Sequence, residues 1–151
     1  MNVITKFESF YTDLASMKVE ELSDIYSDDV VFIDPIAHHL GISSVKQYFS
    51  KLLLDAQYCT FSIHSIDAMK SSDKDPERSS DSSKFIVCWK MTFTSPRINK
   101  GKPIDVDGIT ELKTKDNKIF YHRDYYDLGQ MVYENIPLLG RIIKIIKRKL
   151  G

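Results

Sequence analysis

The chain has 151 residues, of which 42% are hydrophobic and 28% charged, a composition typical of one ordinary globular domain. Its 21 basic residues balance its 21 acidic ones, so the charge lacks the basic excess of a general nucleic-acid-binding protein. No apolar run approaches the length needed to span a bilayer.

Two helices are predicted at the start of the chain. Apolar residues recur at helical spacing over residues 2–15, and a shorter pattern of the same kind covers residues 18–26. The apolar positions of the first helix are Val3, Phe7, Phe10 and Leu14. Charged residues at positions 6, 8 and 13 interrupt this segment, which argues against a signal peptide. We therefore expect a cytoplasmic protein.

The next stretch combines a short strand, a sharp turn and a third helix. The strand Val30–Ile33 ends at Asp34-Pro35, because proline lacks an N–H group for sheet pairing and forces the preceding residue to be extended. After a loop, Gly41 begins an amphipathic helix that ends near Leu54. Asp34 thus stands where the chain leaves the core, either as a turn residue or as a catalytic group at the mouth of a pocket.

Four strands follow, because the apolar period changes to two over residues 58–69, 85–94, 103–113 and 119–128. The alternation slips at Ser65-Ile66, which indicates a bulge, and a tight turn is expected at residues 115–118. Residues 70–84 contain no apolar side chain and predict a flexible hairpin loop. The order of elements predicts an α+β fold with a curved antiparallel sheet wrapped round the helices. Cys59 and Cys88 lie in strands without a C-x-x-C motif, which favours buried, reduced thiols.

The C-terminal segment, residues 137–151, is predicted to be an amphipathic helix separate from the main domain at residues 1–136. Its apolar residues share one face, and Arg141, Lys144, Lys147 and Arg148 share the other, with Lys149 as the exception. The apolar face could pack on its own domain or on a dimer partner. Alternatively, the helix could lie on an anionic membrane as a peripheral contact.

Two stretches carry a resemblance to a known superfamily. The run from Tyr26 to Pro35, followed by Gly41 and Phe49, resembles the first strand and third helix of nuclear-transport-factor-2-like domains. The run KIFYHRDYYDLG, residues 118–129, resembles the last strand of their cyclase and epoxide-hydrolase branches. The superfamily includes ketosteroid isomerases, SnoaL-like polyketide cyclases and limonene-epoxide hydrolases. The resemblance covers residues 2–130 and implies a cone-shaped sheet round three N-terminal helices.

The resemblance also implies roles for two aspartates. The aspartate that matches Asp34 is the proton-shuttling base of the isomerases. The aspartate that matches Asp124 is the general acid or base of the cyclases and hydrolases. Two carboxylates in one apolar cavity raise each other's proton affinity, and an acid–base pair of this kind serves enolisation, aldol cyclisation or epoxide opening.

The chain departs from the family patterns at several positions. Phe10 stands where the isomerases have their oxyanion tyrosine, and the adjacent Tyr11 is expected to point elsewhere. The second oxyanion donor falls near Gly108 or Ile109. The hydrolase Arg-x-Asp and Tyr-x-Asn motifs are also absent, which disfavours both steroid isomerisation by that route and epoxide hydrolysis.

The sequence thus predicts a domain that acts on, or binds, a small hydrophobic ligand that carries oxygen. If it is an enzyme, Asp34 and Asp124 catalyse an isomerase, cyclase or hydrolase reaction without a cofactor. The pocket walls are expected to be Phe10, Phe32, Trp89, His122 and Tyr126. The alternatives are a non-catalytic module for a lipid-like ligand and a protein-interaction module. A homodimer through the sheet is expected, and no metal site is, because the adjacent His38 and His39 seldom converge on one ion. For Asp124 the structural alternative is an ion pair with Lys90 or His122.

Overall fold

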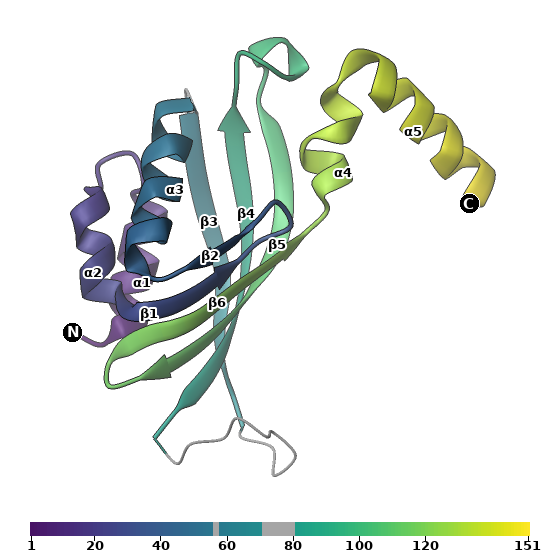
Figure 1. The fold of residues 1–151 in the computed structure, drawn as a ribbon. Helices are drawn as coiled ribbons and strands as arrows, with labels where there is room; N and C mark the ends of the chain where they lie inside the picture. Colours follow the sequence, from purple (N-terminus) through teal and green to yellow (C-terminus); the bar gives the residue numbers. More distant parts are fainter. Residues whose placement is uncertain (56–57, 71–80) are drawn as a thin grey trace.

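The computed structural model describes residues 1–55, 58–70 and 81–151 of the chain. One curved sheet holds the helices α1, α2 and α3 against its inner side, and α5 extends away from the sheet (Figure 1). The strands are β1 (Tyr26–Ile33), β2 (His38–Leu40), β3 (Tyr58–Met69), β4 (Ser83–Thr94), β5 (Ile104–Lys115) and β6 (Lys118–Tyr126). The helices are α1 (Val3–Thr12), α2 (Leu22–Ile25), α3 (Ile42–Asp55), α4 (Leu128–Met131) and α5 (Pro137–Leu150), with 3-10 turns η1 (Val19–Glu21), η2 (Asn99–Gly101) and η3 (Tyr133–Asn135).

The sheet is mixed, and its strand order is β2-β1-β6-β5-β4-β3. Neighbouring strands are antiparallel except for β1 and β6, which are parallel. The α+β class and the cone-like curvature agree with the expectation, and the expected antiparallel pairing holds for every neighbouring pair except β1 and β6. Parallel neighbours need a long crossover connection, and here everything from β2 to β5 forms it. The pairing of β1 with β6 brings residues from opposite ends of the chain together.

Several sequence patterns predict the elements closely. The strand at 58–69 and the helix at 137–150 have the expected bounds, and β3 shifts register between Ile63 and Ser65, next to the predicted bulge. At the β5–β6 turn Asp116 and Asn117 have φ angles of 50° and 58°, as a tight hairpin requires. The predicted loop at 70–84 lies mainly outside the described residues.

Other expectations differ from the structure at the ends of elements. The second helix ends at Ile25, and Tyr26 is already the first residue of β1. The predicted loop after Pro35 contains the short strand β2, which pairs with the end of β1. The last strand ends at Tyr126, because the side chain of Asp127 accepts a hydrogen bond from Gln130 N and caps α4.

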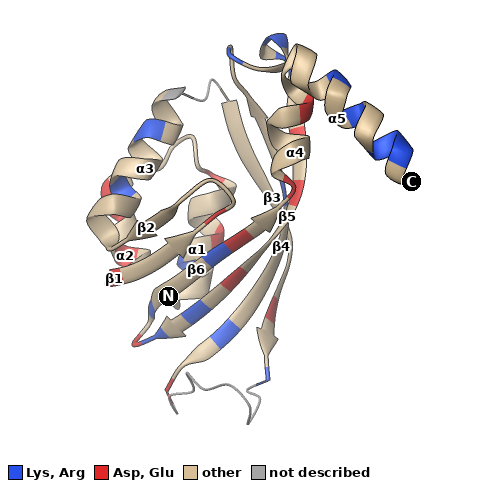
Figure 2. Ribbon diagram, turned by 45° about the vertical axis from the view of Figure 1, so that its right-hand side comes forward, with Lys and Arg blue, Asp and Glu red and all other residues tan. Residues whose placement is uncertain are grey.

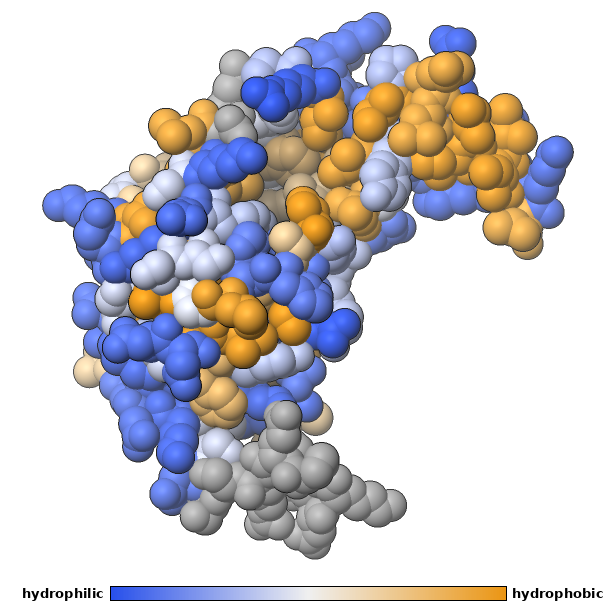
Figure 3. Space-filling model, viewed as in Figure 1, coloured by the Kyte–Doolittle hydropathy of each residue, from blue (hydrophilic) through white to orange (hydrophobic). Residues whose placement is uncertain are grey.

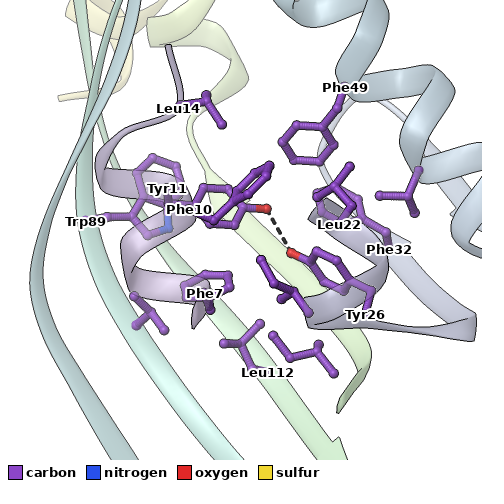
Figure 4. Close-up of a cluster of buried hydrophobic side chains, with 14 of the residues drawn as sticks. Phe7, Phe10, Tyr11, Leu14, Leu22, Tyr26, Phe32, Phe49, Trp89 and Leu112 are labelled. Atoms are coloured by element: carbon purple, nitrogen blue, oxygen red, sulfur yellow. Dashed lines mark hydrogen bonds between the residues drawn. The ribbon is translucent and has the colours of Figure 1, made fainter. Parts of the chain in front are cut away.

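The core lies between the three N-terminal helices and the inner side of the sheet. The four positions that predicted the first helix, Val3, Phe7, Phe10 and Leu14, are all buried. They meet Phe32 and Phe49 from β1 and α3, and Trp89 and Leu112 from the sheet (Figure 4). The N-terminus of α1 is fixed to the β5–β6 turn, because Val3 N donates a hydrogen bond of 2.7 Å to Asn117 Oδ1.

Candidate active site

The strand β6 carries the side chains at the centre of the site. The β5–β6 register shifts at Phe120, so Ile119 rather than Phe120 enters the core with His122. Phe120 instead borders a hollow beside Ser27 and Lys118. Strict alternation over residues 119–128 would put Phe120 on the same face as His122, and this is wrong because a bulge moves the alternation by one residue. Beyond the bulge His122 is buried, and Asp124 is 17% exposed.

His122 uses both ring nitrogens. Nε2 lies 2.9 Å from Asp124 Oδ1, and Nδ1 lies 2.8 Å from the hydroxyl of Tyr26. The hydroxyl of Tyr26 lies 2.9 Å from that of Tyr11, and Figure 4 shows the two tyrosines pointing toward one another from β1 and α1. The ring of Phe32 stacks on the imidazole with centroids 4.1 Å apart. His122 is thus held in one orientation between a carboxylate and a buried pair of hydroxyl groups.

A second set of bonds reaches Asp124 from the sheet. Thr110 Oγ1 donates to Asp124 Oδ1 over 2.5 Å, and Trp89 Nε1 donates to Thr110 Oγ1 over 2.7 Å. The indole lies against Gly108, where a Cβ atom would be 2.2 Å from the ring. Gly108, one of the two positions near which the resemblance puts the second oxyanion donor of the isomerases, therefore makes room for Trp89.

These bonds have one consistent assignment when Asp124 is ionised and His122 is neutral. His122 carries its proton on Nε2 and donates to Asp124, while Nδ1 accepts from Tyr26. Tyr26 then accepts from Tyr11. If His122 gains a proton, the direction reverses: Nδ1 donates to Tyr26, and Tyr26 donates to Tyr11. We refer to Tyr11, Tyr26, Trp89, Thr110, His122 and Asp124 as the Asp124 network.

The tyrosines of this region are held in the neutral form. Burial, reinforced by the nearby Asp124, raises the pKa of Tyr11 and of Tyr26 well above the ordinary value of 10.0. Burial also raises the pKa of Tyr126, with the charges of Asp34 and Asp124 adding to the effect. A phenol with a raised pKa keeps its proton at neutral pH and can donate it in a hydrogen bond.

A small cavity adjoins the Asp124 network, between α1 and the inner side of β3, β4, β5 and β6. Its lining residues are Phe7, Tyr11, Phe61, Ile63, Val87, Trp89, Thr110 and Asp124. Its volume of about 10 Å³ is close to the minimum that holds one water molecule. The polar groups of Tyr11, Thr110 and Asp124 therefore meet in an otherwise apolar space, which must widen to admit a larger molecule.

Asp34 lies in a different environment. Its Oδ1 accepts hydrogen bonds of 2.8 Å from the backbone N–H groups of Ile36 and Ala37, and its Oδ2 accepts one of 2.7 Å from the hydroxyl of Tyr48. The backbone closes the turn, because Asp34 N donates to Ala37 O over 3.0 Å. We refer to Asp34–Ala37 with Tyr48 as the Asp34 turn. The bonds match the turn-residue interpretation that the sequence left open.

The remaining predicted site residues divide between core and pocket. Phe10 packs on Tyr11 and Phe49 and is absent from the cavity lining. Phe32 is also absent from the lining and contacts the site through His122 and Tyr26. Trp89 lines the cavity. Tyr126 is absent from the lining and packs against Trp89, with the two ring centroids 6.1 Å apart.

The sequence interpretation missed three polar members of the site. The expectation that Tyr11 points elsewhere is wrong, because Tyr11 is buried and lines the cavity. Its position four residues after Phe7, on the same side of a helix, was an available signal. Tyr26 and Thr110 carried no such signal, since their partners are distant in the chain.

The other ionisable groups named from the sequence lie elsewhere. Lys90 is paired in register with Asp107 rather than with Asp124. His38 and His39 lie on β2, and His39 stacks on Tyr48 with centroids 4.4 Å apart. Within residues 1–55, 58–70 and 81–151, no three His, Cys, Asp or Glu side chains are grouped to hold a metal ion.

The comparison with protein families identifies the class. The profile of the SnoaL-like domain matches residues 7–122, a match over most of the chain. The chain therefore belongs to the SnoaL-like domain family of the nuclear-transport-factor-2-like superfamily, whose fold is shared by cyclases and isomerases. No curated protein sequence matches it.

Solved structures share the same fold. A hypothetical protein from Catenulispora acidiphila with a ketosteroid isomerase-like fold, in complex with trimethylamine, has a TM-score of 0.65 at 17% identity over 90% of this chain and 92% of its own. TerC co-crystallised with polyporic acid has a TM-score of 0.65 at 14% identity, over 85% and 94%. A type 2 hexachlorocyclohexane dehydrochlorinase, LinA, has a TM-score of 0.68 at 11% identity, over 83% of both chains. At these identities the likeness shows the fold.

Proposed function

We propose that this protein is a cofactor-independent enzyme of the isomerase or cyclase type. It removes and returns a proton at a carbon next to a carbonyl group in a small hydrophobic ligand. The observation that carries the proposal is the Asp124 network: a carboxylate and a phenol meet at an apolar cavity, and a buried histidine lies behind them. A purely structural role would not require so many buried polar groups at a cavity wall.

Asp124 is the group assigned to proton transfer. It lines the cavity, whereas His122 is absent from the lining and is almost fully buried. The bonds from His122 and Thr110 both end on Oδ1, which leaves Oδ2 without a protein partner among the described residues. The Asp124 carboxylate accepts the proton from the ligand carbon and becomes a carboxylic acid, while the ligand becomes an enolate.

Tyr11 is assigned to the developing negative charge on the ligand oxygen. Its raised pKa keeps the phenol protonated. When a ligand is bound, the hydroxyl turns its proton from Tyr26 to the enolate oxygen and donates a hydrogen bond there. Asp124 then returns the proton to another carbon in an isomerisation. In a cyclisation, the enolate carbon instead attacks a carbonyl carbon, and Asp124 protonates the resulting alkoxide. Neither reaction needs an oxidant or a reductant.

The two aspartates thus receive different roles. Asp34 already accepts three hydrogen bonds and is absent from the cavity lining. We assign it to positioning, because its bond to the Tyr48 hydroxyl holds the Tyr48 ring beside Phe32, which in turn packs on His122.

The experiment measures exchange of carbon-bound protons with deuterated solvent by NMR, over a panel of apolar ketones, enones and 1,3-dicarbonyl compounds. The wild type should accelerate exchange in at least one compound. Asp124→Asn should lower that acceleration by about a hundredfold or more, and the matched control Asp34→Asn should retain most of it. Exchange that survives Asp124→Asn unchanged would contradict the assignment.

A second candidate function is a non-catalytic interaction module. The size of the cavity, about 10 Å³, favours this alternative, because a ligand larger than a water molecule enters only if lining side chains move. Trp89 borders the cavity and is the only tryptophan, so its fluorescence reports ligand entry. If no compound of the panel changes Trp89 emission or exchanges protons, the interaction module is the better description.

We also propose a homodimer through the outer side of the sheet. Ile109 and Tyr125 are 44% and 47% exposed and are cross-strand neighbours on β5 and β6. Exposed apolar residues that adjoin on a sheet are typical of a protein interface. Sedimentation of the wild type against Ile109→Glu tests this proposal, and identical masses would contradict it.

A further inference from the structure

The helix α5 exposes a continuous apolar face. Leu138 is 72% exposed, Ile146 is 49% exposed and Leu150 is 83% exposed. We define the α5 apolar face as Leu138, Leu139, Ile142, Ile145, Ile146 and Leu150. In Figure 3 hydrophobic side chains gather along this helix, at the end that extends from the body of the protein. Large exposed apolar patches mark interaction surfaces.

The helix meets its own domain with a different side. A Cβ atom on Gly140 would lie 2.2 Å from the carbonyl oxygen of Glu134, so η3 passes close to the helix backbone there. Lys147 Nζ forms an ion pair with Glu134 Oε1 at 2.5 Å. Gly140 and Lys147 lie on nearly the same side of the helix, away from the centre of the apolar face. The intramolecular contact therefore leaves the α5 apolar face uncovered.

The charge of α5 has one sign. Residues 137–151 contain Arg141, Lys144, Lys147, Arg148 and Lys149 and no acidic residue. Since the whole chain has 21 basic and 21 acidic residues, the remainder carries five more acids than bases. Figure 2 shows the basic residues along the helix. Arg141, Lys144 and Arg148 lie on the side opposite the apolar face, and all three are exposed.

The composition of α5 favours a lipid surface over a protein partner. Protein interfaces are enriched in aromatic residues, methionine and arginine and depleted in lysine. Residues 137–151 have no aromatic residue and no methionine, and three of their five cations are lysines. The aliphatic residues span an arc of about 160°, wider than the narrow seam of a helix pair. Lys149 is the exception, because helical spacing places it inside that arc, between Leu138 and Ile142. It lies in the last turn of the helix, where a long side chain can extend to the lipid headgroups.

We propose that α5 binds the surface of anionic lipid bilayers, with its apolar face in the acyl boundary and its cations among the headgroups. An amphipathic helix with this pattern lies in the plane of the membrane. No helix in the described residues is long and apolar enough to cross a membrane. The proposal is independent of the reaction proposed above, because the family match ends at residue 122.

The test is flotation of the full-length protein with vesicles of phosphatidylcholine alone or mixed with phosphatidylglycerol. The wild type should float with the mixed vesicles. Each basic residue near an anionic surface strengthens partitioning by about fivefold, so the triple variant R141Q/K144Q/R148Q should lose about a hundredfold. Lys147 is left in place because it pairs with Glu134. The matched control K51Q/R97Q/K115Q removes three exposed cations elsewhere and should bind like the wild type.

A second variant tests the apolar face. I142E/I146E should abolish flotation while its melting temperature stays near that of the wild type, since both side chains are exposed. Equal binding of the wild type to neutral and mixed vesicles would overturn the proposal, and so would an equal loss in the control variant. The proposal is also overturned if I142E/I146E lowers the oligomeric mass without vesicles, because α5 would then be a protein interface.

Discussion

The Asp34 turn and the Asp124 network solve the same problem in different ways. Each keeps a carboxylate next to the core. Asp34 is buried and directly follows β1, whereas Asp124 is half-buried and lies within β6. The partners of Asp34 are two backbone N–H groups within three residues and a hydroxyl fourteen residues away. The Asp124 network is linked through Tyr26 and His122, which are 96 residues apart. A carboxylate with local backbone partners is stabilised by its own turn, whereas one with distant side-chain partners depends on the whole fold.

The largest loss of stability is expected at Gly108, where the Asp124 network is most tightly packed. Gly108→Ala places a methyl group 2.2 Å from an atom of the Trp89 ring, which must move and release Thr110. Overpacking and a lost buried hydrogen bond together should lower the free energy of unfolding by about 3 kcal/mol. Urea unfolding measures the loss, and Trp89 emission reports the displaced ring.

The double variant G108A/W89L is the control for this prediction. Leucine lacks the ring atoms that the new methyl group meets, so the two substitutions should show a strong favourable coupling. If Gly108→Ala unfolds at the wild-type urea concentration with unchanged emission, the network tolerates the methyl group. The close packing of Gly108 on Trp89 would then make no contribution to stability.

A matched pair of Tyr→Phe substitutions compares the two regions directly. Tyr26→Phe leaves Tyr11 and His122 Nδ1 without their buried partner and should cost about 2–3 kcal/mol. Tyr48→Phe removes one of three bonds to Asp34 and should cost about 1 kcal/mol. Denaturant unfolding at pH 7 measures both, and a larger loss for Tyr48→Phe would reverse the comparison.

Substitutions of Asp34 sharpen the account of the turn. Asparagine keeps the side-chain oxygen that accepts from the Ile36 and Ala37 N–H groups and is favoured in turns. Asp34→Asn should therefore cost under about 1 kcal/mol, and Asp34→Ala about 2 kcal/mol. Equal losses for the two variants would show that the turn does not depend on this oxygen.

The smallest expected effect is a loss of folding stability that is absent at neutral pH and appears only in alkaline solution. Because the pKa of Tyr26 is raised above 10.0 in the folded protein, the folded state keeps a proton that the unfolded state releases. Its contribution to stability is complete below pH 10 and is lost as pH rises further, at about 1.4 kcal/mol per pH unit. Tyr48, whose pKa burial also raises, acts in the same direction.

Unfolding measured from pH 8 to pH 11 checks this sign. Tyr26→Phe and Tyr48→Phe should each reduce the slope of the free energy of unfolding against pH by the contribution of one proton. Their losses of stability at pH 7 should nevertheless differ. A variant as steep as the wild type would indicate that its tyrosine ionises normally in the folded state.

The sequence alone determined the features that depend on neighbouring residues. Helical spacing placed Phe7 and Phe10 in the core, Asp34-Pro35 marked the end of β1, and the amphipathic pattern located α5. These signals are local because a helix repeats every 3.6 residues, a strand alternates every two, and proline restricts its own neighbour. The alternation of a strand also puts Asp124 on the same side of β6 as His122, and the two side chains meet in the structure.

Only the tertiary structure decided the composition of the site. The parallel pairing of β1 with β6 brings Tyr26 to His122, and β5 brings Thr110 to Asp124. A single bulge at Phe120 shifted which side chains face inward, and the packing of α1 turned Tyr11 toward the cavity. These contacts join residues that are far apart in the chain, so no local pattern encodes them. The direction of α5 is of the same kind, since the close approach of Gly140 to Glu134 decides which face of the helix stays uncovered.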